Sequence, residues 1–351
     1  MKTIRRARGA LSIVLATAAV LVVAQGTHRN EPIQPLPDQA TDVDAAKVKL
    51  GARLFADKRF SADNTVSCQS CHLPEHGGAD PRRHSVSAFG KVRELNSPTI
   101  LNVRYNTSGL NWTGRTRDLD AQIAGSIGNA DTMAHDWGKV MQILAADPQV
   151  VAEFKAAYGG DDAVSQKNAM HAIVSFEKSL VTPSRFDDWL KGDDRALTAQ
   201  EQRGYDRFKA YGCVGCHNGI NVGGNGFMKL GIAGDYFAER EKMGRGAAVE
   251  LDKGRLLVTK KPEDLHVFRV PSLRNVALTA PYFHDGAVPT LDEAIQLMGR
   301  FQLGREIPAG DRQDIAAFLQ SLTGKQYEQW AASPASARAL GGFGLPPAGG
   351  R

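Results

Sequence analysis

The sequence lacks most of the features that mark membrane, all-β and nucleic-acid-binding proteins. After the first 24 residues, no stretch of the 351-residue chain is apolar and long enough to span a bilayer. Runs that alternate apolar and polar residues are scarce, which disfavours a protein built from half-buried strands. Helical spacing is frequent instead, so we predict a soluble, mainly α protein.

A basic surface for nucleic acid is also absent once the amino terminus is set aside. The formal net charge of +5 includes four cations in residues 1–24, a segment without any acidic residue. Without that segment, 39 Lys and Arg residues stand against 38 Asp and Glu residues. This near balance gives no support to nucleic-acid binding.

Residues 1–24 have the pattern of an export signal. Four basic residues precede an apolar run from Ala10 to Ala24, which has the length of a signal peptide and is short for a membrane span. Small residues before Gln25 suit cleavage. We predict a signal peptide over residues 1–24 and a periplasmic mature protein, with an uncleaved membrane anchor as the alternative.

Cysteine is rare, and its four copies all stand in two motifs, CQSCH over residues 68–72 and CVGCH over residues 213–217. A C-x-x-C pair alone fits half of a zinc site, a dithiol redox centre or a disulfide. Covalent haem attachment needs the following histidine as well, because that residue becomes the proximal ligand of the iron. Two copies favour two c-type haems, with a four-thiolate zinc site as the alternative. The predicted haem-binding residues are Cys68, Cys71, His72, Cys213, Cys216 and His217.

The spacing of the two motifs predicts two domains. They stand 145 residues apart, and each follows a helical pattern. We predict haem domains over residues 41–190 and 191–325, and an extended or disordered tail over residues 326–351. The glycine-rich stretch after the second motif lacks the Gly-Lys-Ser/Thr ending of a phosphate-binding loop, so we expect it to wrap a haem edge.

Apolar residues at helical spacing indicate where the helices lie. The sequences TAQE at Thr198 and TLDE at Thr290 are capping boxes that begin helices, the first of which should run to Cys213. The other predicted helices begin at Val43, extend from Lys139 to Tyr158 with a break at Pro148, from Gln166 to Val181, and from Asp311 to Leu322.

The sixth ligand of each iron decides what that haem does. A thioether favours the ferrous state and electron transfer, whereas an open position admits a small oxidant. Met298 lies 81 residues after His217 on the apolar face of a predicted helix. Spacing alone leaves core packing and iron ligation equally open, because methionine commonly fills gaps in cores.

The segment FRVPSLRNVALTAPYFHDGAVPTLDEAIQLMGRFQLG, from Phe268 to Gly304, resembles the signature of the bacterial dihaem cytochrome c peroxidases. The segments LGARLFADKRFSADNTVSCQSCH, NSPTILNVRYN, FEKSLVTPSRFD and GCVGCHNGINVGG resemble the same family, in register from about residue 46 to residue 325. The resemblance implies two cytochrome-c-like domains around two haems. It implies that hydrogen peroxide is reduced to water at the amino-terminal haem. A small cytochrome c or cupredoxin would supply electrons to the carboxy-terminal haem. Such proteins are usually homodimers.

The resemblance assigns roles to particular residues. His72 is the proximal ligand of the peroxidatic iron, and His217 and Met298 are the axial pair of the other iron. Trp112 corresponds to a tryptophan between the haems that can relay electrons, although burial in a core is the ordinary role of a tryptophan. Gln122 corresponds to a glutamine beside the peroxide pocket.

The resemblance also implies a calcium ion between the haems. Its ligands would be the side chain of Asn96 and the carbonyl oxygens of Thr279 and Pro281. Oxygen ligands suit this hard cation.

The chain departs from the family pattern at the position of a capping histidine. Relatives use that histidine to close the resting peroxidatic iron, and this chain has Ala88 there. We expect the neighbouring His76 and His84 to lie in solvated loops. The oxidised protein should therefore hold a five-coordinate peroxidatic iron that needs no reductive activation.

A second departure concerns the proton that lets the O–O bond of peroxide break. Relatives carry a glutamate where this chain has Thr132, and Asp131 is the nearest substitute. Positioned acid–base catalysis contributes about a hundredfold to ten-thousandfold, and threonine is not an acid near neutral pH. The alternative function is therefore an electron-transfer or redox-sensing dihaem cytochrome with little peroxidase activity. A third is a MauG-like enzyme that oxidises proteins, although those relatives place a tyrosine where Met298 stands.

Overall fold

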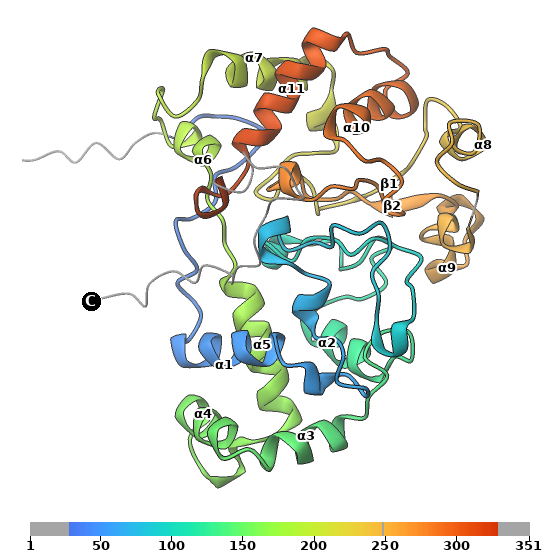
Figure 1. The fold of residues 1–351 in the computed structure, drawn as a ribbon. Coiled ribbons are helices and arrows are strands. Elements are labelled where there is room, and N and C mark those ends of the chain that lie inside the picture. The colour runs from blue at the N-terminus through green and yellow to red at the C-terminus, as the bar shows by residue number, and fades with distance from the viewer. Residues whose placement is uncertain (1–27, 248, 329–351) are drawn as a thin grey trace, which may run out of the picture.

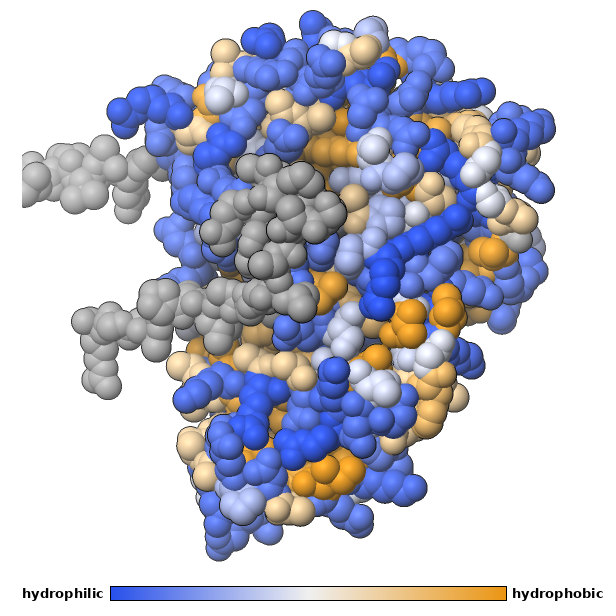
Figure 2. All heavy atoms as spheres, viewed as in Figure 1, coloured by the Kyte–Doolittle hydropathy of each residue, from blue (hydrophilic) through white to orange (hydrophobic). Residues whose placement is uncertain are grey.

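The computed structural model describes residues 28–247 and 249–328 and shows two helical bodies, one stacked on the other (Figure 1). The predicted signal peptide over residues 1–24 and the tail from residue 329 onward lie outside the described residues. No helix in the described part of the chain is long and apolar enough to cross a membrane. On the face drawn in Figure 2, hydrophilic side chains prevail, and the apolar ones form small separate patches.

The architecture is mainly α, as predicted. The first body contains α1 (Ala45–Phe55), α2 (Leu119–Gly128), α3 (Trp137–Ala145), α4 (Pro148–Tyr158) and α5 (Gln166–Ser179). The second contains α6 (Arg185–Leu190), α7 (Ala199–Ala210), α8 (Tyr236–Arg240), α9 (Leu256–Thr259), α10 (Leu291–Leu297) and α11 (Ala309–Ser321). The described strands are β1 (Phe227–Lys229) and β2 (Val267–Arg269), which pair antiparallel.

Local sequence signals account for the helix ends. The side chain of Thr198 caps α7 in a capping box with Glu201, and Pro148 begins α4, where its missing N–H costs nothing. The helix predicted to run to Cys213 ends at Ala210 instead, because the second haem motif forms its own 3-10 turn, Cys213–Gly215.

Each body is built around a close crossing of two helices, one of which leads to a haem motif. A Cβ atom on Gly51 of α1 would lie 2.0 Å from the carbonyl oxygen of Ala172 in α5. A Cβ atom on Gly204 of α7 would lie 1.9 Å from the carbonyl oxygen of Asp314 in α11. Only glycine permits such contact. The two crossings therefore hold both haem motifs in similar settings.

The apolar core is divided in two, and the division corrects the predicted domain boundaries. Phe186 and Leu190 of α6 belong to the second core although they precede residue 191, so the second body includes α6. Ile33, close to the amino terminus, also packs in the second core. Tyr327 is buried in the first core, so the folded part extends beyond the boundary predicted at residue 325.

A buried ion pair joins distant segments of the second body. Arg274 Nη1 lies 2.9 Å from Asp187 Oδ2, and both side chains have no exposed area. Arg274 also donates to the carbonyl oxygens of Ile220, at 2.6 Å, and Gln34, at 3.0 Å. Asp187 accepts from the backbone N–H of Leu36 at 2.7 Å. The pair therefore fixes the amino-terminal segment against α6 and the loop after the second haem motif.

Replacing Arg274 by methionine should lower the free energy of unfolding by about 3 to 5 kcal/mol, because it leaves a buried carboxylate unpaired. Urea unfolding followed by circular dichroism measures the loss. The control is Arg195→Met, since the Arg195 side chain is 95% exposed and its removal should cost about 0.5 kcal/mol or less. Equal losses in both variants would contradict the prediction.

Candidate active site

The first cavity is lined mainly by residues of the first body, including the first haem motif. Cys68, Cys71 and His72 line it, together with Phe55 of α1. His72 Nδ1 lies 3.0 Å from the carbonyl oxygen of Gly78, an arrangement that leaves Nε2 for a metal. Burial lowers the pKa of His72, so its ring is neutral, as a metal ligand must be.

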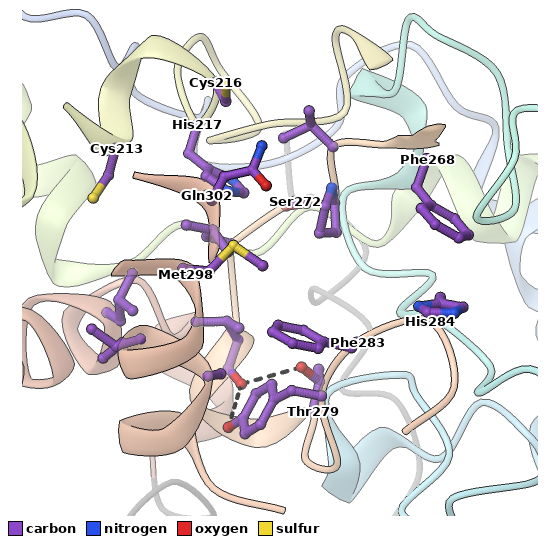
Figure 3. A pocket seen from close by; sticks show the side chains of 18 of the residues that line it. Cys213, Cys216, His217, Phe268, Ser272, Thr279, Phe283, His284, Met298 and Gln302 are labelled. Atoms are coloured by element: carbon purple, nitrogen blue, oxygen red, sulfur yellow. Dashed lines mark hydrogen bonds between the residues drawn. The ribbon is translucent and has the colours of Figure 1, made fainter. Parts of the chain in front are cut away.

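The second cavity is lined mainly by residues of the second body, including the second haem motif. Figure 3 shows that His217 and Met298 both project into it, one from the loop after α7 and the other from the end of α10. Met298 begins a π-helical turn, Met298–Gln302, a feature frequent at functional sites. Burial lowers the pKa of His217 to about 4. The structure thus brings the predicted axial pair to one cavity, which Met228 of β1 also lines.

The geometry of the cysteines argues against the zinc and disulfide alternatives. All four are free, and the two pairs line separate cavities, so they cannot form one four-thiolate site. Burial raises the pKa of Cys68 to about 12 and that of Cys213 to about 11. In the described residues, no three His, Cys, Asp or Glu side chains gather to hold a metal ion.

Trp112 lies at the boundary between the two cavities. Its side chain lines both of them. Its indole Nε1 donates to the carbonyl oxygen of Asn96 at 2.8 Å, and its ring meets that of His284 edge to face, with centroids 6.5 Å apart. An aromatic ring in this position borders both sites at once, which the interior of a core would not require.

Comparison with known proteins agrees with this arrangement. The family model described as di-haem cytochrome c peroxidase matches residues 45–195. The chain is 40% identical to the cytochrome c551 peroxidase of Nitrosomonas europaea, over 89% of this chain and 90% of that protein. The chain belongs to the dihaem cytochrome c peroxidase family. It is also 46% identical to the cytochrome c peroxidase Ccp of Escherichia coli, over 85% of this chain but only 62% of that protein's length. A solved MauG-like protein associated with microbial copper homeostasis has 28% identity and a TM-score of 0.73, covering 88% of this chain and 97% of that one.

The two cavities fit the two haems of this family. Each contains one C-x-x-C-H motif with both thiols free for thioether bonds and a neutral histidine at the proximal position. Apolar side chains make up most of the remaining lining of the second cavity, as a porphyrin face requires.

The side chain of Gln122 is fixed in the first cavity of this family member. Its Oε1 accepts from Asn111 Nδ2 at 2.8 Å, and its Nε2 donates to Ser126 Oγ at 2.9 Å. Gln122 also lines the first cavity.

Thr132 and Asp131 are poorly placed as proton donors, which corrects the roles considered for them. The Thr132 hydroxyl donates to the backbone carbonyls of Ser126 and Asn129, so its single proton is committed to the turn that contains it. The Asp131 carboxylate forms an ion pair with Lys91, and this hydrogen bond lowers its pKa. An ionised carboxylate has no proton to give.

The loop at the predicted capping position is held against the first cavity. Ala88 is buried, and its N–H donates to the carbonyl oxygen of Thr132 at 2.9 Å. His76 is buried rather than solvated, which corrects that expectation. Neither His76 nor His84 lines the first cavity, and His72 is its only histidine among the described residues. Met133 is the one methionine of the described chain that lines it.

The three residues predicted to bind calcium lie along one cavity. Asn96, Thr279 and Pro281 line the second cavity together. Both N–H groups of the Asn96 amide donate to backbone carbonyls, to Asp80 at 3.2 Å and to Arg82 at 2.9 Å. This leaves its Oδ1, a hard ligand, for a cation.

Two charged residues that line the cavities were not predicted from the sequence. Glu177 of α5 lines the first cavity, and Arg269 lines both. The signal for Glu177 is its helical spacing with the buried residues Ile173 and Leu180, which puts a carboxyl group on an apolar face. The signal for Arg269 is a charge inside the otherwise apolar run VFRVP.

Proposed function

We propose that this protein is a periplasmic cytochrome c peroxidase. Electrons from a small cytochrome c or a cupredoxin enter at the His217 and Met298 site, pass by way of Trp112, and reduce hydrogen peroxide to water at the His72 site. The observation that carries the proposal is that one tryptophan lines both cofactor cavities. Two relatives that are 40% and 46% identical to the chain are cytochrome c peroxidases by name, which supports the same activity.

The residues around the first cavity have separate roles in the proposed reaction. A haem supplies an iron that accepts and donates single electrons and binds small oxidants. His72 would hold the haem iron, and Ala88 offers no imidazole as a second ligand. Gln122, fixed by its hydrogen bonds, offers polar contacts to peroxide.

The experiment is peroxide consumption by the purified holoprotein with a reduced cytochrome c. We expect consumption far above the rate of free haem, and a large loss of donor-dependent turnover in Trp112→Phe with both haems retained. A rate equal to that of free haem would refute the proposal. Electron paramagnetic resonance of the oxidised protein should show a high-spin ferric signal. Two low-spin haems would mean that a ligand such as Met133 closes the first iron.

Two substitutions can show which methionine of the second cavity, Met298 or Met228, binds the haem iron opposite His217. Met298→His should lower the midpoint potential of that haem by on the order of a tenth of a volt, within the range of about 0.8 V that axial ligands span. The control is Met228→His, which makes the same exchange on β1. Spectroelectrochemical titration measures both variants. A drop in the Met228 variant alone would assign the ligand to Met228.

A second candidate function is electron transfer or redox sensing with little peroxide turnover. The specific observation in its favour is that neither Thr132 nor Asp131 has a proton to donate into the cavity. Normal reduction of both haems without peroxide consumption would establish it. A MauG-like role is disfavoured, because Met298 projects into the second cavity at the position where MauG-like relatives have a tyrosine.

We also propose that Asn96, Thr279 and Pro281 bind a calcium ion between the haems, and that the protein forms a homodimer. The first rests on the Asn96 Oδ1 atom and on the place of all three residues along the second cavity. The second rests on the family resemblance alone. Removal of calcium by a chelator should lower turnover, and added calcium should restore it. Sedimentation measures the oligomeric state.

A further inference from the structure

Arg269 is a buried cation at the boundary of the two cavities. It is the last residue of β2, and only 5% of its surface is exposed. Among the Lys, Arg, Asp and Glu residues of the described chain, it alone lines both cavities. Its backbone N–H donates to the carbonyl oxygen of Trp112 at 2.8 Å, so its position is tied to that of the tryptophan.

The described chain does not neutralise this charge. Arg269 Nε donates to the carbonyl oxygen of Asn111 at 3.0 Å, and Nη1 to Asn106 Oδ1 at 3.4 Å. Neither acceptor is charged, and no carboxylate of the described residues pairs with Arg269. A guanidinium carries five N–H donors, so three remain without a partner within residues 28–247 and 249–328. Burial accordingly lowers the pKa of Arg269 to about 10.

A buried guanidinium without a charged partner is costly, and an anion from outside the chain would stabilise it. A planar carboxylate matches its fork of donors, and each c-type haem carries two propionate groups. We propose that Arg269 binds a haem propionate at the boundary between the cavities and holds that haem at a higher reduction potential. The inference rests on the two haems of the family and not on peroxidase activity.

The other cations of the cavities are less suited to this role. Lys229 and Arg115 are exposed, so water screens their charges. Arg93 is half-buried and donates to the carbonyl oxygen of Asp131 at 2.5 Å, and the exposed Lys91 pairs with the Asp131 carboxylate. Arg269 is the buried cation that reaches both sites, and its loss should affect at least one haem directly.

The test is a potential titration of the holoprotein with Arg269→Met. Removal of a nearby positive charge favours the ferric form, which carries one more positive charge. At a fixed applied potential, the ferrous-to-ferric ratio of at least one haem should fall by about tenfold, which corresponds to about 59 mV for a one-electron couple. Both haems unchanged in a folded variant that keeps its full haem content would overturn the proposal.

Two further variants keep the test decisive. Arg255 is a half-buried arginine that donates to the carbonyl oxygen of Thr113 at 3.0 Å and lines neither cavity. Arg255→Met should therefore leave both potentials unchanged, and an equal fall there would refute a specific role for Arg269. If Arg269→Met does not fold, Arg269→Lys keeps the charge but loses the planar fork. The propionate bending band in its resonance Raman spectrum should shift, and a band identical to that of the wild type would overturn the proposal.

Discussion

Replacing Thr132 by glutamate should raise the rate of peroxide reduction by about a hundredfold to ten-thousandfold, the usual contribution of a positioned acid or base. Thr132 lines the first cavity, so a longer side chain at this position enters the space beside Gln122. The wild-type hydroxyl is committed to two backbone carbonyls and cannot supply the proton that the leaving oxygen needs. Stopped-flow mixing with hydrogen peroxide measures the rate.

The matched control is Thr132→Gln, which has the same size as the glutamate variant but carries no acidic proton. It should react at the wild-type rate, because added bulk and hydrogen bonding alone do not transfer a proton. A gain in both variants would show that shape rather than acidity matters. No gain in either would mean that another group already supplies the proton.

Replacing Glu177 by glutamine should make the protein more stable at alkaline pH, by up to about 5 kcal/mol, and change little at pH 4. Glu177 is buried in the first cavity, and no residue of the described chain forms a hydrogen bond with its Oε2. Burial raises its pKa from 4.5 to about 8. The folded protein therefore keeps this proton over a pH range in which the unfolded chain has lost it.

The direction of the effect follows from proton binding. Between pH 4.5 and about 8 the folded state binds one more proton than the unfolded state, so the wild-type free energy of unfolding falls as pH rises, by up to about 1.4 kcal/mol per unit. This stabilisation is complete below pH 4.5 and lost as pH passes 8. Glutamine does not titrate, so the variant should lack this slope. Urea unfolding from pH 4 to pH 9 measures it.

The control for this titration is Glu263→Gln, which removes an exposed carboxyl group outside both cavities. Its stability curve should run parallel to that of the wild type. A constant difference between wild type and Glu177→Gln across the whole pH range would show that Glu177 has no raised pKa.

Local signals made much of the fold and site predictable. The haem motifs and the capping residue Thr198 act on their immediate neighbours in sequence, so spacing alone locates them. The pairing of Met298 with His217 and the position of Trp112 depend on contacts between distant segments, and the family resemblance supplied these. In the structure, Met298 and His217 line one cavity and Trp112 lines both.

The remaining features depend on contacts that no pattern encodes. The hydroxyl of Thr132 turns toward backbone carbonyls, which a residue name does not reveal. His76 is buried because the loop around it folds inward. The domain boundary shifts because Phe186 packs against Tyr205 of α7 and Phe318 of α11, and Leu190 belongs to the same core. Side-chain packing decides each of these cases.

The amino-terminal segment that contacts Arg274 makes the second body discontinuous in sequence. Ile33 fills part of its core, and Gln34 and Leu36 complete the hydrogen bonds of the buried ion pair, yet the entire first body intervenes before α6. A fragment that starts at residue 191 would lack these residues and Asp187 as well. A single cut between the two bodies therefore removes Ile33, Gln34 and Leu36 from the second body. In a nascent chain, the hydrogen bonds of Gln34 and Leu36 cannot form until Asp187 and Arg274 have been synthesised.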